Sequence, residues 1–312
     1  MNAKPKILFV DDEKHILFAL RAVFRSQYEV FTANSGAEAL DILSKEHIHA
    51  IISDQRMPQM AGHELLREVK VRYPNTMRLL LTGYSDIPAI LNSINEGEVF
   101  RFINKPWKNE EIRSTIDSAV QIALNTLGSA PRYPEENQAS TPETSGVGIL
   151  VIDQSPSLVD MIKASFPQHA VHVAQSIELA MDVLARQEIA VLIADLSVKG
   201  EDTTEFIKLL KQQYPLIMSI VLTDILDADA AIDLINQGQI FRYIRKTSSK
   251  AVLGMGIKHA LYFYARNKSK PELLQRYKVE TLKEIRNPSL AERLLGRLKS
   301  LRSRFSFGFA RS

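Results

Sequence analysis

Short apolar runs alternate with segments of helical spacing along the first 125 or so residues of the chain. Residues 6–10, KILFV, form a continuous apolar run, as expected of a strand covered on both faces. Ser35 and Glu38 form a capping-box pattern where a helix should begin. The pattern predicts strands near 6–10, 29–33, 50–54, 78–82 and 100–105, and helices near 14–25, 36–45, 63–72, 87–94 and 110–124. These five strand–helix units predict a doubly wound parallel sheet with right-handed crossovers.

The pattern then repeats in the second half of the chain. Residues 94–106, INEGEVFRFINKP, return as INQGQIFRYIRKT at 235–247, an offset of 141 residues. Internal repetition of this kind predicts a second copy of the same fold. The prediction is two flavodoxin-like α/β domains, each with a doubly wound, five-stranded parallel sheet, followed by a helical basic tail. The predicted boundaries are 1–127 for the first domain, 128–147 for a flexible Pro- and Ser-rich linker, 148–268 for the second domain and 269–312 for the tail.

Polar residues stand where four strands of the first domain end. Asp11 and Asp12 follow the first strand, and Asp54 ends the third. Thr82 ends the fourth strand, and Lys105 closes the fifth. In a doubly wound sheet the carboxyl ends of the strands face one crevice, so these side chains are expected to converge. A lone aspartate at a strand end would instead indicate a turn or a helix cap.

This set of motifs resembles the receiver domain of two-component response regulators, over about residues 5–125. The resemblance implies that Asp54 accepts a phosphoryl group from a histidine kinase or a phosphotransfer protein. Three groups would hold Mg²⁺ together with Asp54: the carboxylates of Asp11 and Asp12 and the backbone carbonyl of Arg56. The chemistry agrees, because a carboxylate nucleophile can form an acyl phosphate and Mg²⁺ prefers oxygen ligands.

The resemblance also assigns residues that respond to the phosphoryl group. Thr82 and Lys105 would contact its oxygens. Phe102 would be the aromatic switch residue, which changes its packing when the threonine moves toward the phosphate. The alternative for Phe102 is simple packing against the fourth or fifth helix.

The second copy departs from the pattern at its predicted site. Gln154 replaces the second acid, Asp224 replaces a glycine, and Val198-Lys199 replaces Met-Pro. A neutral amide binds Mg²⁺ more weakly than a carboxylate, and Asp224 is expected to repel a phosphoryl group and narrow access to the site. The second domain is therefore predicted to be a degenerate receiver that packs, dimerises or binds a partner. The residues that correspond to the first site are Asp153, Gln154, Asp195, Thr223, Tyr243 and Lys246.

The C-terminal tail carries much of the positive charge. From Arg266 onward there are 13 Lys and Arg against 4 Asp and Glu, a balance of +9 that leaves −6 for the rest of the chain. A helix opening at Asn287-Pro288 would place leucines mostly on one face. This helix would pack on another domain or a second subunit, lie on a membrane surface, or contact nucleic acid. The candidate contact residues are Arg293, Arg297, Arg302 and Arg304.

Composition narrows the functional class. The 312 residues are 45% hydrophobic and 24% charged, and they include no cysteine, which excludes disulfides, thiolate metal sites and thiol nucleophiles. There is no apolar stretch of about 18 residues and no signal-peptide pattern, so a cytoplasmic protein is expected. The seven histidines form no HD or HExxH pair, so the sequence shows no motif of a metal-dependent hydrolase.

The leading hypothesis is a response regulator whose output passes through protein contacts of the second domain and the tail. Its only expected catalysis is its own phosphoryl transfer and dephosphorylation, so it is not expected to be an enzyme. The alternative is a regulator that binds nucleic acid or a membrane through the tail. A flavin site is disfavoured by the acidic strand ends.

Overall fold

The protein is described from a computed structural model, in which residues 3–83, 91, 95, 99–126, 146–153, 155–224, 228–277, 292 and 294–297 are placed well enough to describe. The chain forms two compact units, residues 1–137 with 227–236 and residues 138–226 with 237–312. The predicted helix at 87–94, the linker and most of the tail helix lie outside the described residues. The predicted domain boundaries therefore stay predictions.

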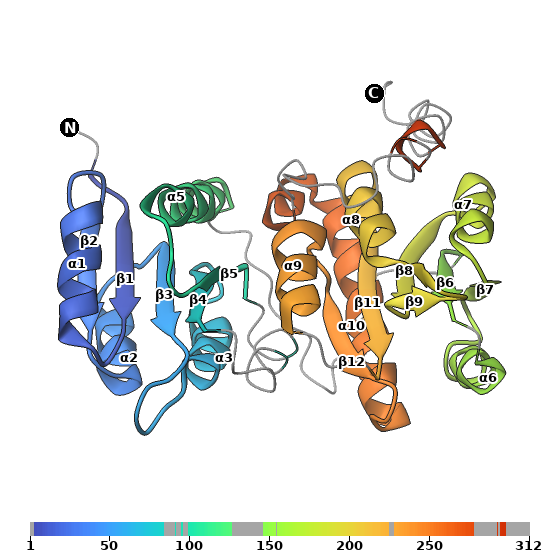
Figure 1. Ribbon diagram of the computed structural model, residues 1–312, viewed down its shortest axis with the longest axis horizontal. Helices are drawn as coiled ribbons and strands as arrows, with labels where there is room; N and C mark the ends of the chain where they lie inside the picture. The colour runs from blue at the N-terminus through green and yellow to red at the C-terminus, as the bar shows by residue number, and fades with distance from the viewer. Residues whose placement is uncertain are drawn as a thin grey trace. The chain divides into compact units, whose positions relative to one another are not determined.

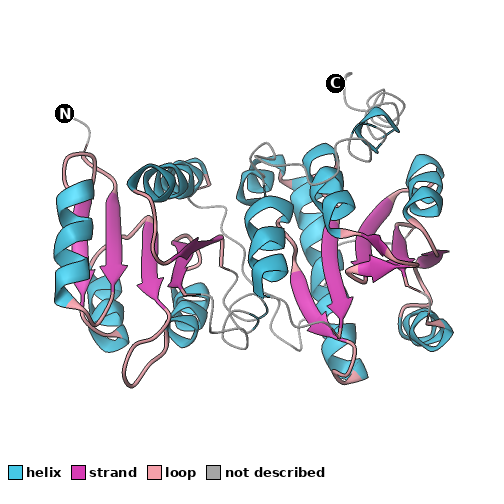
Figure 2. Ribbon diagram, viewed as in Figure 1, coloured by secondary structure: helices cyan, strands magenta, loops and turns pink. Residues whose placement is uncertain are grey.

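The first unit contains a five-stranded parallel sheet with the strand order β2-β1-β3-β4-β5 (Figures 1 and 2). This order is the doubly wound one that the alternation of strands and helices predicted. Its elements are β1 (Lys6–Val10), α1 (Lys14–Phe24), β2 (Glu29–Ala33), α2 (Gly36–Lys45), β3 (Ala50–Asp54), α3 (Gly62–Arg72), β4 (Met77–Thr82), β5 (Arg101–Asn104) and α5 (Asn109–Asn125).

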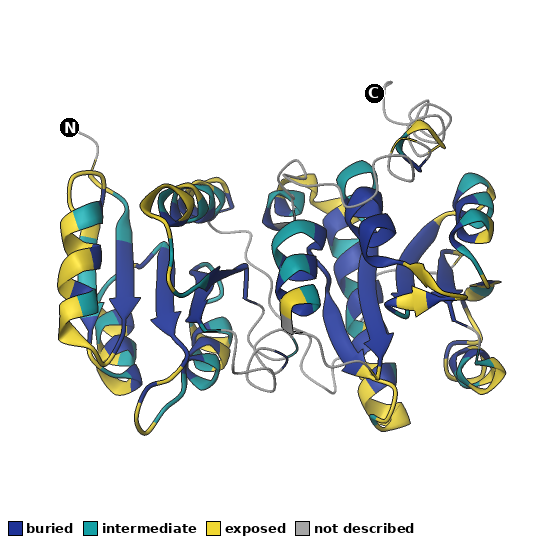
Figure 3. Cartoon of the chain, viewed as in Figure 1, coloured by how far each residue is buried: buried dark blue, intermediate teal, exposed yellow. Residues whose placement is uncertain are grey.

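One face of the first sheet packs against α1 and α5. The core on this face includes Phe9 and Leu79 from the sheet, Phe24 from α1, and Ile112 and Ile116 from α5. Strands β1, β3, β4 and β5 are mostly buried, β2 is mostly part-exposed, and the outer faces of the helices are exposed (Figure 3). This distribution explains why the strands read as continuous apolar runs and the helices as amphipathic segments.

The second unit contains a similar sheet, with the order β7-β6-β8-β11-β12. All four pairings are parallel, as in the first sheet, so a second similar sheet is present, and the identification of this unit as a receiver-like domain stays a prediction. Its elements are β6 (Gly148–Ile152), α6 (Pro156–Ser165), β7 (Ala170–Ala174), α7 (Ile177–Arg186), β8 (Ile189–Ala194), α8 (Thr204–Gln213), β11 (Met218–Thr223), β12 (Arg242–Arg245) and α10 (Lys250–Ser269). Helix α9 (Ala228–Gly238) comes between β11 and β12 in the chain, and most of its residues belong to the first unit. A 3₁₀ helix follows at Pro271–Tyr277.

A small hairpin follows β8 in the second unit. Strands β9 (Ser197–Val198) and β10 (Glu201–Asp202) pair antiparallel around Lys199 and Gly200. Both turn residues have positive φ, at 51° and 79°, as a type I′ turn requires. The equivalent loop of the first unit instead contains Pro58, which fixes its own φ and lacks a backbone N–H.

Within the described residues, no helix is both long enough and apolar enough to span a bilayer.

Candidate functional site

Three of the predicted site residues meet at the carboxyl edge of the first sheet. Asp54 ends β3 and Asp11 directly follows β1, and only 8% and 1% of their side chains are exposed. The Nζ atom of Lys105 lies 2.5 Å from Oδ1 of Asp54 and 3.0 Å from Oδ2 of Asp11. Because β1 and β3 are neighbours in the sheet, one ammonium group can bridge the two carboxylates.

Backbone N–H groups hold the other oxygen of each carboxylate. Arg56 donates to Oδ2 of Asp54 at 2.6 Å, and Glu13 donates to Oδ1 of Asp11 at 2.9 Å. Each carboxylate is thus oriented by Lys105 through one oxygen and by the following loop through the other. The loop after β3 therefore controls the direction in which Asp54 presents its oxygens.

The charges at this site are strongly coupled. Burial raises the pKa of Asp11 above its ordinary value, although the Glu13 amide and the Lys105 ammonium act in the opposite direction. Burial lowers the pKa of Lys105, but its bonds to Asp54 and Asp11 outweigh that effect and the pKa is raised overall. Lys105 therefore stays protonated at neutral pH and supplies the positive charge that this pair of carboxylates needs.

Thr82 and Phe102 lie on neighbouring strands. Thr82 is buried, and its hydroxyl donates to the carbonyl of Gly83 at 3.0 Å. Phe102 is also buried and stands opposite Leu80 in the β4–β5 register. Its neighbour Ile103 belongs to the core beneath α1 and α5, so strand alternation directs Phe102 to the other face. Both the role of Phe102 as a switch and the alternative of simple packing against the fourth or fifth helix stay predictions, because most of the predicted fourth helix lies outside the described residues.

The loop between β3 and α3 contains contacts that the sequence did not predict. The backbone carbonyl of Gln55 accepts from the Gly62 N–H at 3.0 Å, and its side chain contacts His63. A Cβ atom at position 62 would lie 2.1 Å from the Asp54 carbonyl oxygen, so a side chain there requires a shift of the backbone. In the sequence, the sign of this contact is a glycine at the start of the predicted helix. A glycine there does not by itself predict that the helix lies close to the Asp54 carbonyl.

The oxygen donors at this edge fit a hard divalent cation. The carboxylates of Asp11 and Asp54 already converge on one positive charge, and Mg²⁺ prefers carboxylate and carbonyl oxygens. Asp12 is exposed, and among the described residues no group of three or more His, Cys, Asp or Glu side chains is placed to hold a metal ion. The ligand roles of Asp12 and of the Arg56 carbonyl therefore stay predictions.

The second unit repeats the arrangement of charges. Nζ of Lys246 lies 2.7 Å from Oδ2 of Asp153 and 2.6 Å from Oδ2 of Asp195. The Thr223 carbonyl accepts from the Lys246 N–H at 3.2 Å, just as the Thr82 carbonyl accepts from the Lys105 N–H at 2.9 Å in the first unit. The charged core of the site is thus present twice.

The differences lie around this core. Gln154 is outside the described residues, and Tyr243 is buried. Thr203 stands where the first unit has Gly62, and its hydroxyl donates to the Asp195 carbonyl. Asp224 is exposed, and 20% of the Asp195 side chain is exposed, against 8% for Asp54. The effect of Asp224 on access to this site therefore stays a prediction.

Of the four predicted tail contacts, Arg297 is described, and it pairs with Asp182 of α7 at 2.7 Å. Leu294 beside it is buried. Arg293, Arg302 and Arg304 lie outside the described residues, so the binding role of the tail stays a prediction.

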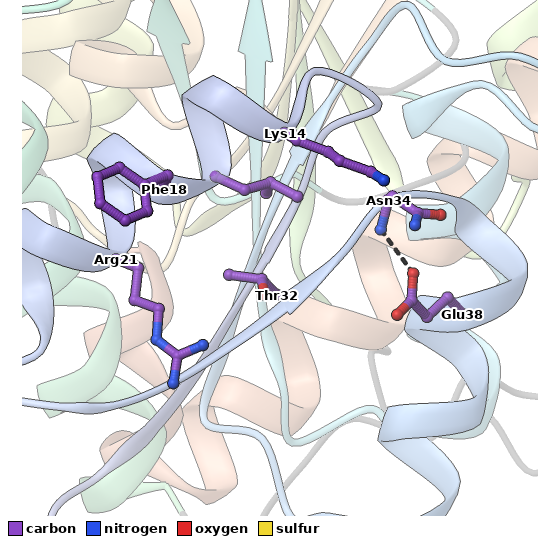
Figure 4. Close-up of a pocket in the computed structure, with 7 residues that line it drawn as sticks. Lys14, Phe18, Arg21, Thr32, Asn34 and Glu38 are labelled. Atoms are coloured by element: carbon purple, nitrogen blue, oxygen red, sulfur yellow. Dashed lines mark hydrogen bonds between the residues drawn. The ribbon is translucent and has the colours of Figure 1, made fainter.

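A surface pocket of about 270 Å³ lies in the first unit beside α1 (Figure 4). It is lined by Lys14, Phe18 and Arg21 of α1 together with Thr32, Asn34 and Glu38. Glu38 accepts from the Asn34 N–H at 2.8 Å, which closes one side of the pocket. Neither Asp54 nor Lys105 lines it, so this pocket is distinct from the charged site.

Comparison with known proteins agrees with the geometry of the first unit. Residues 7–117 match the family described as the response regulator receiver domain. Sporulation initiation phosphotransferase F of Bacillus subtilis is 34% identical over 121 residues, which cover 38% of this chain and 97% of that protein. The hydrogenase transcriptional regulatory protein HoxA of Bradyrhizobium diazoefficiens is 36% identical over 122 residues, 39% of this chain.

The matched segment spans only 25% of the length of that HoxA protein. Among solved structures, the signal receiver domain of an HD domain-containing protein from Pseudomonas fluorescens is 34% identical, with a TM-score of 0.39, and the match covers 40% of this chain and 92% of that one.

Proposed function

Because this chain belongs to the response regulator receiver family, we propose that its first unit is a phosphorylation switch centred on Asp54. A histidine kinase or a phosphotransfer protein is the proposed donor. The observation that carries the proposal is the Lys105 ammonium group, which joins the buried carboxylates of Asp54 and Asp11 at the carboxyl edge of the sheet. Asp54 is the proposed acceptor because it ends β3 at the carboxyl edge of the sheet, where Lys105 contacts one of its oxygens and the Arg56 N–H the other.

The proposed step is a direct transfer to the Asp54 carboxylate. One oxygen of Asp54 attacks the phosphorus atom, and a P–O bond forms as the P–N bond to the donor imidazole breaks, with its electron pair returning to the nitrogen. Lys105 is close enough to neutralise charge on the transferred group, and Thr82 stands on the neighbouring strand with a hydroxyl to donate. Mg²⁺, held by Asp11, Asp12, Asp54 and the Arg56 carbonyl, would offset the negative charge that gathers there.

The proposed output uses the second unit and the tail, through contacts with a downstream protein or a second copy of the chain. The second unit keeps the sheet and the Lys246 bridge, but Gln154 replaces an acid at its metal site. This combination supports a degenerate receiver that transmits a signal rather than accepts a phosphoryl group. The charge balance of +9 after residue 265 supports the alternative in which the tail binds nucleic acid or a membrane surface.

The test is intact mass after incubation with acetyl phosphate and Mg²⁺. Wild type should gain one phosphoryl group, Asp54→Asn should gain none, and Asp195→Asn should behave as wild type. Chelation of the metal with EDTA should abolish the gain. Two phosphoryl groups on wild type would show that the second site is active, and none on any variant would contradict the phosphorylation switch.

A further inference from the structure

The loop after the proposed acceptor is tied to α3 by one buried side chain, that of Gln55. Its Oε1 atom accepts from the backbone N–H of His63 at 3.2 Å, and its Nε2 atom lies 2.9 Å from Nδ1 of His63. Its backbone carbonyl accepts from the Gly62 N–H. Three contacts therefore join one residue of the loop to the first turn of a helix that begins seven residues later.

These contacts complete the cap of α3. The first N–H groups of a helix have no partners within the helix, and a side chain at the N-cap usually satisfies one of them. The N-cap of α3 is Ala61, which has no oxygen in its side chain, although its own N–H donates to the Glu64 carboxylate at 2.9 Å. The Gln55 amide supplies the missing acceptor for the His63 N–H from across the loop, so Gln55 and Glu64 together hold the start of α3.

The pairing also determines the state of the histidine ring. The amide oxygen of Gln55 faces the His63 N–H, so its NH₂ group faces Nδ1 of the ring. Nδ1 must then accept, which requires an imidazole with its proton on Nε2. The same side chain cannot bind an Nδ1–H without losing the bond to the backbone of His63.

The geometry points to Gln55 and His63 as positioning residues for phosphoryl transfer at Asp54. The residue after Gln55 is Arg56, whose N–H holds Oδ2 of Asp54 at 2.6 Å. A closed loop keeps that N–H aimed at the acceptor and keeps the Arg56 carbonyl where it is predicted to bind the metal. This inference rests on the proposed function of Asp54.

The second unit supplies an internal comparison. At the same offset of 141 residues, Leu196 stands in place of Gln55 and Thr204 in place of His63. Neither side chain can make the amide–imidazole pair, and the loop there forms the β9–β10 hairpin instead. The pair thus occurs in the unit that keeps the complete set of predicted site residues and is missing from the degenerate one.

The experiment uses intact mass to measure how fast the 312-residue chain takes up a phosphoryl group from acetyl phosphate, across a range of Mg²⁺ concentrations. Gln55→Leu copies the second unit, and we expect it to be about five- to tenfold slower, the effect of losing a hydrogen bond or two. More Mg²⁺ should also be needed for half of the maximal rate. Val71→Ala, at a residue 73% exposed on the same helix, is the control and should match wild type.

Two substitutions of His63 distinguish the loss of its hydrogen bond with Gln55 from the loss of its side-chain packing. His63→Asn keeps an acceptor near the place of Nδ1 and should restore most of the rate that His63→Leu loses. Combining Gln55→Leu with His63→Leu should cost little more than either change alone, because both remove the same pair. The His63 amide should exchange slowly with solvent in wild type and faster in Gln55→Leu, as followed by NMR.

A wild-type rate in Gln55→Leu, or equal rates in His63→Asn and His63→Leu, would overturn the inference while Asp54 remains an acceptor. A wild-type chain that takes up no phosphate would instead overturn the proposed function, and the positioning role with it. Rapid exchange of the His63 amide in wild type would overturn the pairing itself, whatever the phosphorylation result.

Discussion

Two lysines, one half-buried and one fully buried, show how neighbouring groups decide the charge of one type of side chain. Lys105 contacts the carboxylates of Asp11 and Asp54, and its pKa is raised despite burial. Lys211, at the end of α8, donates to the neutral carbonyl oxygens of Pro215 and Ile217 at 2.8 and 3.0 Å. Burial lowers its pKa to about 7. One lysine is therefore a fixed charge, whereas the other titrates near neutral pH.

The pKa of Lys211 predicts a dependence of stability on pH. Below pH 7 the folded state must carry a buried ammonium group, and this opposes folding. Between pH 7 and about 10.5 the unfolded chain holds the proton that the folded chain has lost, so stability rises with pH by up to ~1.4 kcal/mol per unit. Lys211→Met should remove this rise.

Urea unfolding at pH 6, 7.5 and 9, followed by circular dichroism, would measure this effect. Lys258→Met, at an exposed lysine of α10, is the control and should keep the wild-type slope. A slope for Lys211→Met equal to that of wild type would show that another group is responsible.

At the scale of elements, the two units start the helix after their third strand differently. In the first unit, Gly62 lets α3 begin directly against the Asp54 carbonyl. In the second unit, Thr203 occupies that position and its hydroxyl donates to the Asp195 carbonyl. The close approach of the helix to the third strand is thus possible in one unit because Gly62 has no side chain, and in the other because the Thr203 side chain forms a hydrogen bond.

This difference predicts that Gly62→Ala is poorly tolerated. Its Cβ atom would lie 2.1 Å from a backbone oxygen, and backbone cannot move aside as a flexible side chain can. We expect a loss of about 1–3 kcal/mol of stability, together with slower phosphorylation of Asp54. Urea unfolding and intact mass would measure both effects.

Gly254→Ala is the matched control, because position 254 in α10 has open space around it. An alanine there should be neutral or stabilise the chain by up to ~1 kcal/mol, as expected in a helix interior. Equal costs for the two substitutions would contradict the close approach at Gly62.

At the scale of the whole molecule, the chain contains one fold twice but the complete set of predicted metal ligands only once. Both sheets have the same strand order, and both carry a lysine between two carboxylates. The first unit keeps Asp12, whereas the second has Gln154. The two units thus share the strand order and the ion-pair core but differ in the predicted ligand set.

The 312-residue chain should therefore bind a single Mg²⁺ ion in isothermal titration calorimetry. Asp11→Asn should abolish binding, because it removes a charged ligand, and Asp153→Asn should leave the number of bound ions at one. Trp107, partly buried against the core beneath α1 and α5, offers a second signal for the same titration. Binding of two ions by wild type would show that Gln154 is tolerated as a ligand.

Local pattern predicted most of the described strands and helices of the first unit, although not the β9–β10 hairpin of the second. The apolar run at 6–10 became β1, and the pattern at 36–45 became α2, capped as expected by the Ser35 hydroxyl on the Glu38 N–H at 3.3 Å. The repeat at an offset of 141 residues correctly predicted a second sheet. These features follow from side-chain spacing and from short-range hydrogen bonds, which the sequence displays directly.

The tertiary structure decided which of the predicted side chains touch. Lys105 bridges Asp11 and Asp54, whereas Asp12, adjacent in sequence, is exposed. The contact of Gln55 with His63 depends on the path of the β3–α3 loop. Periodicity assigns a residue to a face of its own strand or helix, but distances between elements depend on strand order and loop path. The contacts of Asp54 with Lys105 and with the following loop are therefore known only from the tertiary structure, in which the sheet brings these elements together.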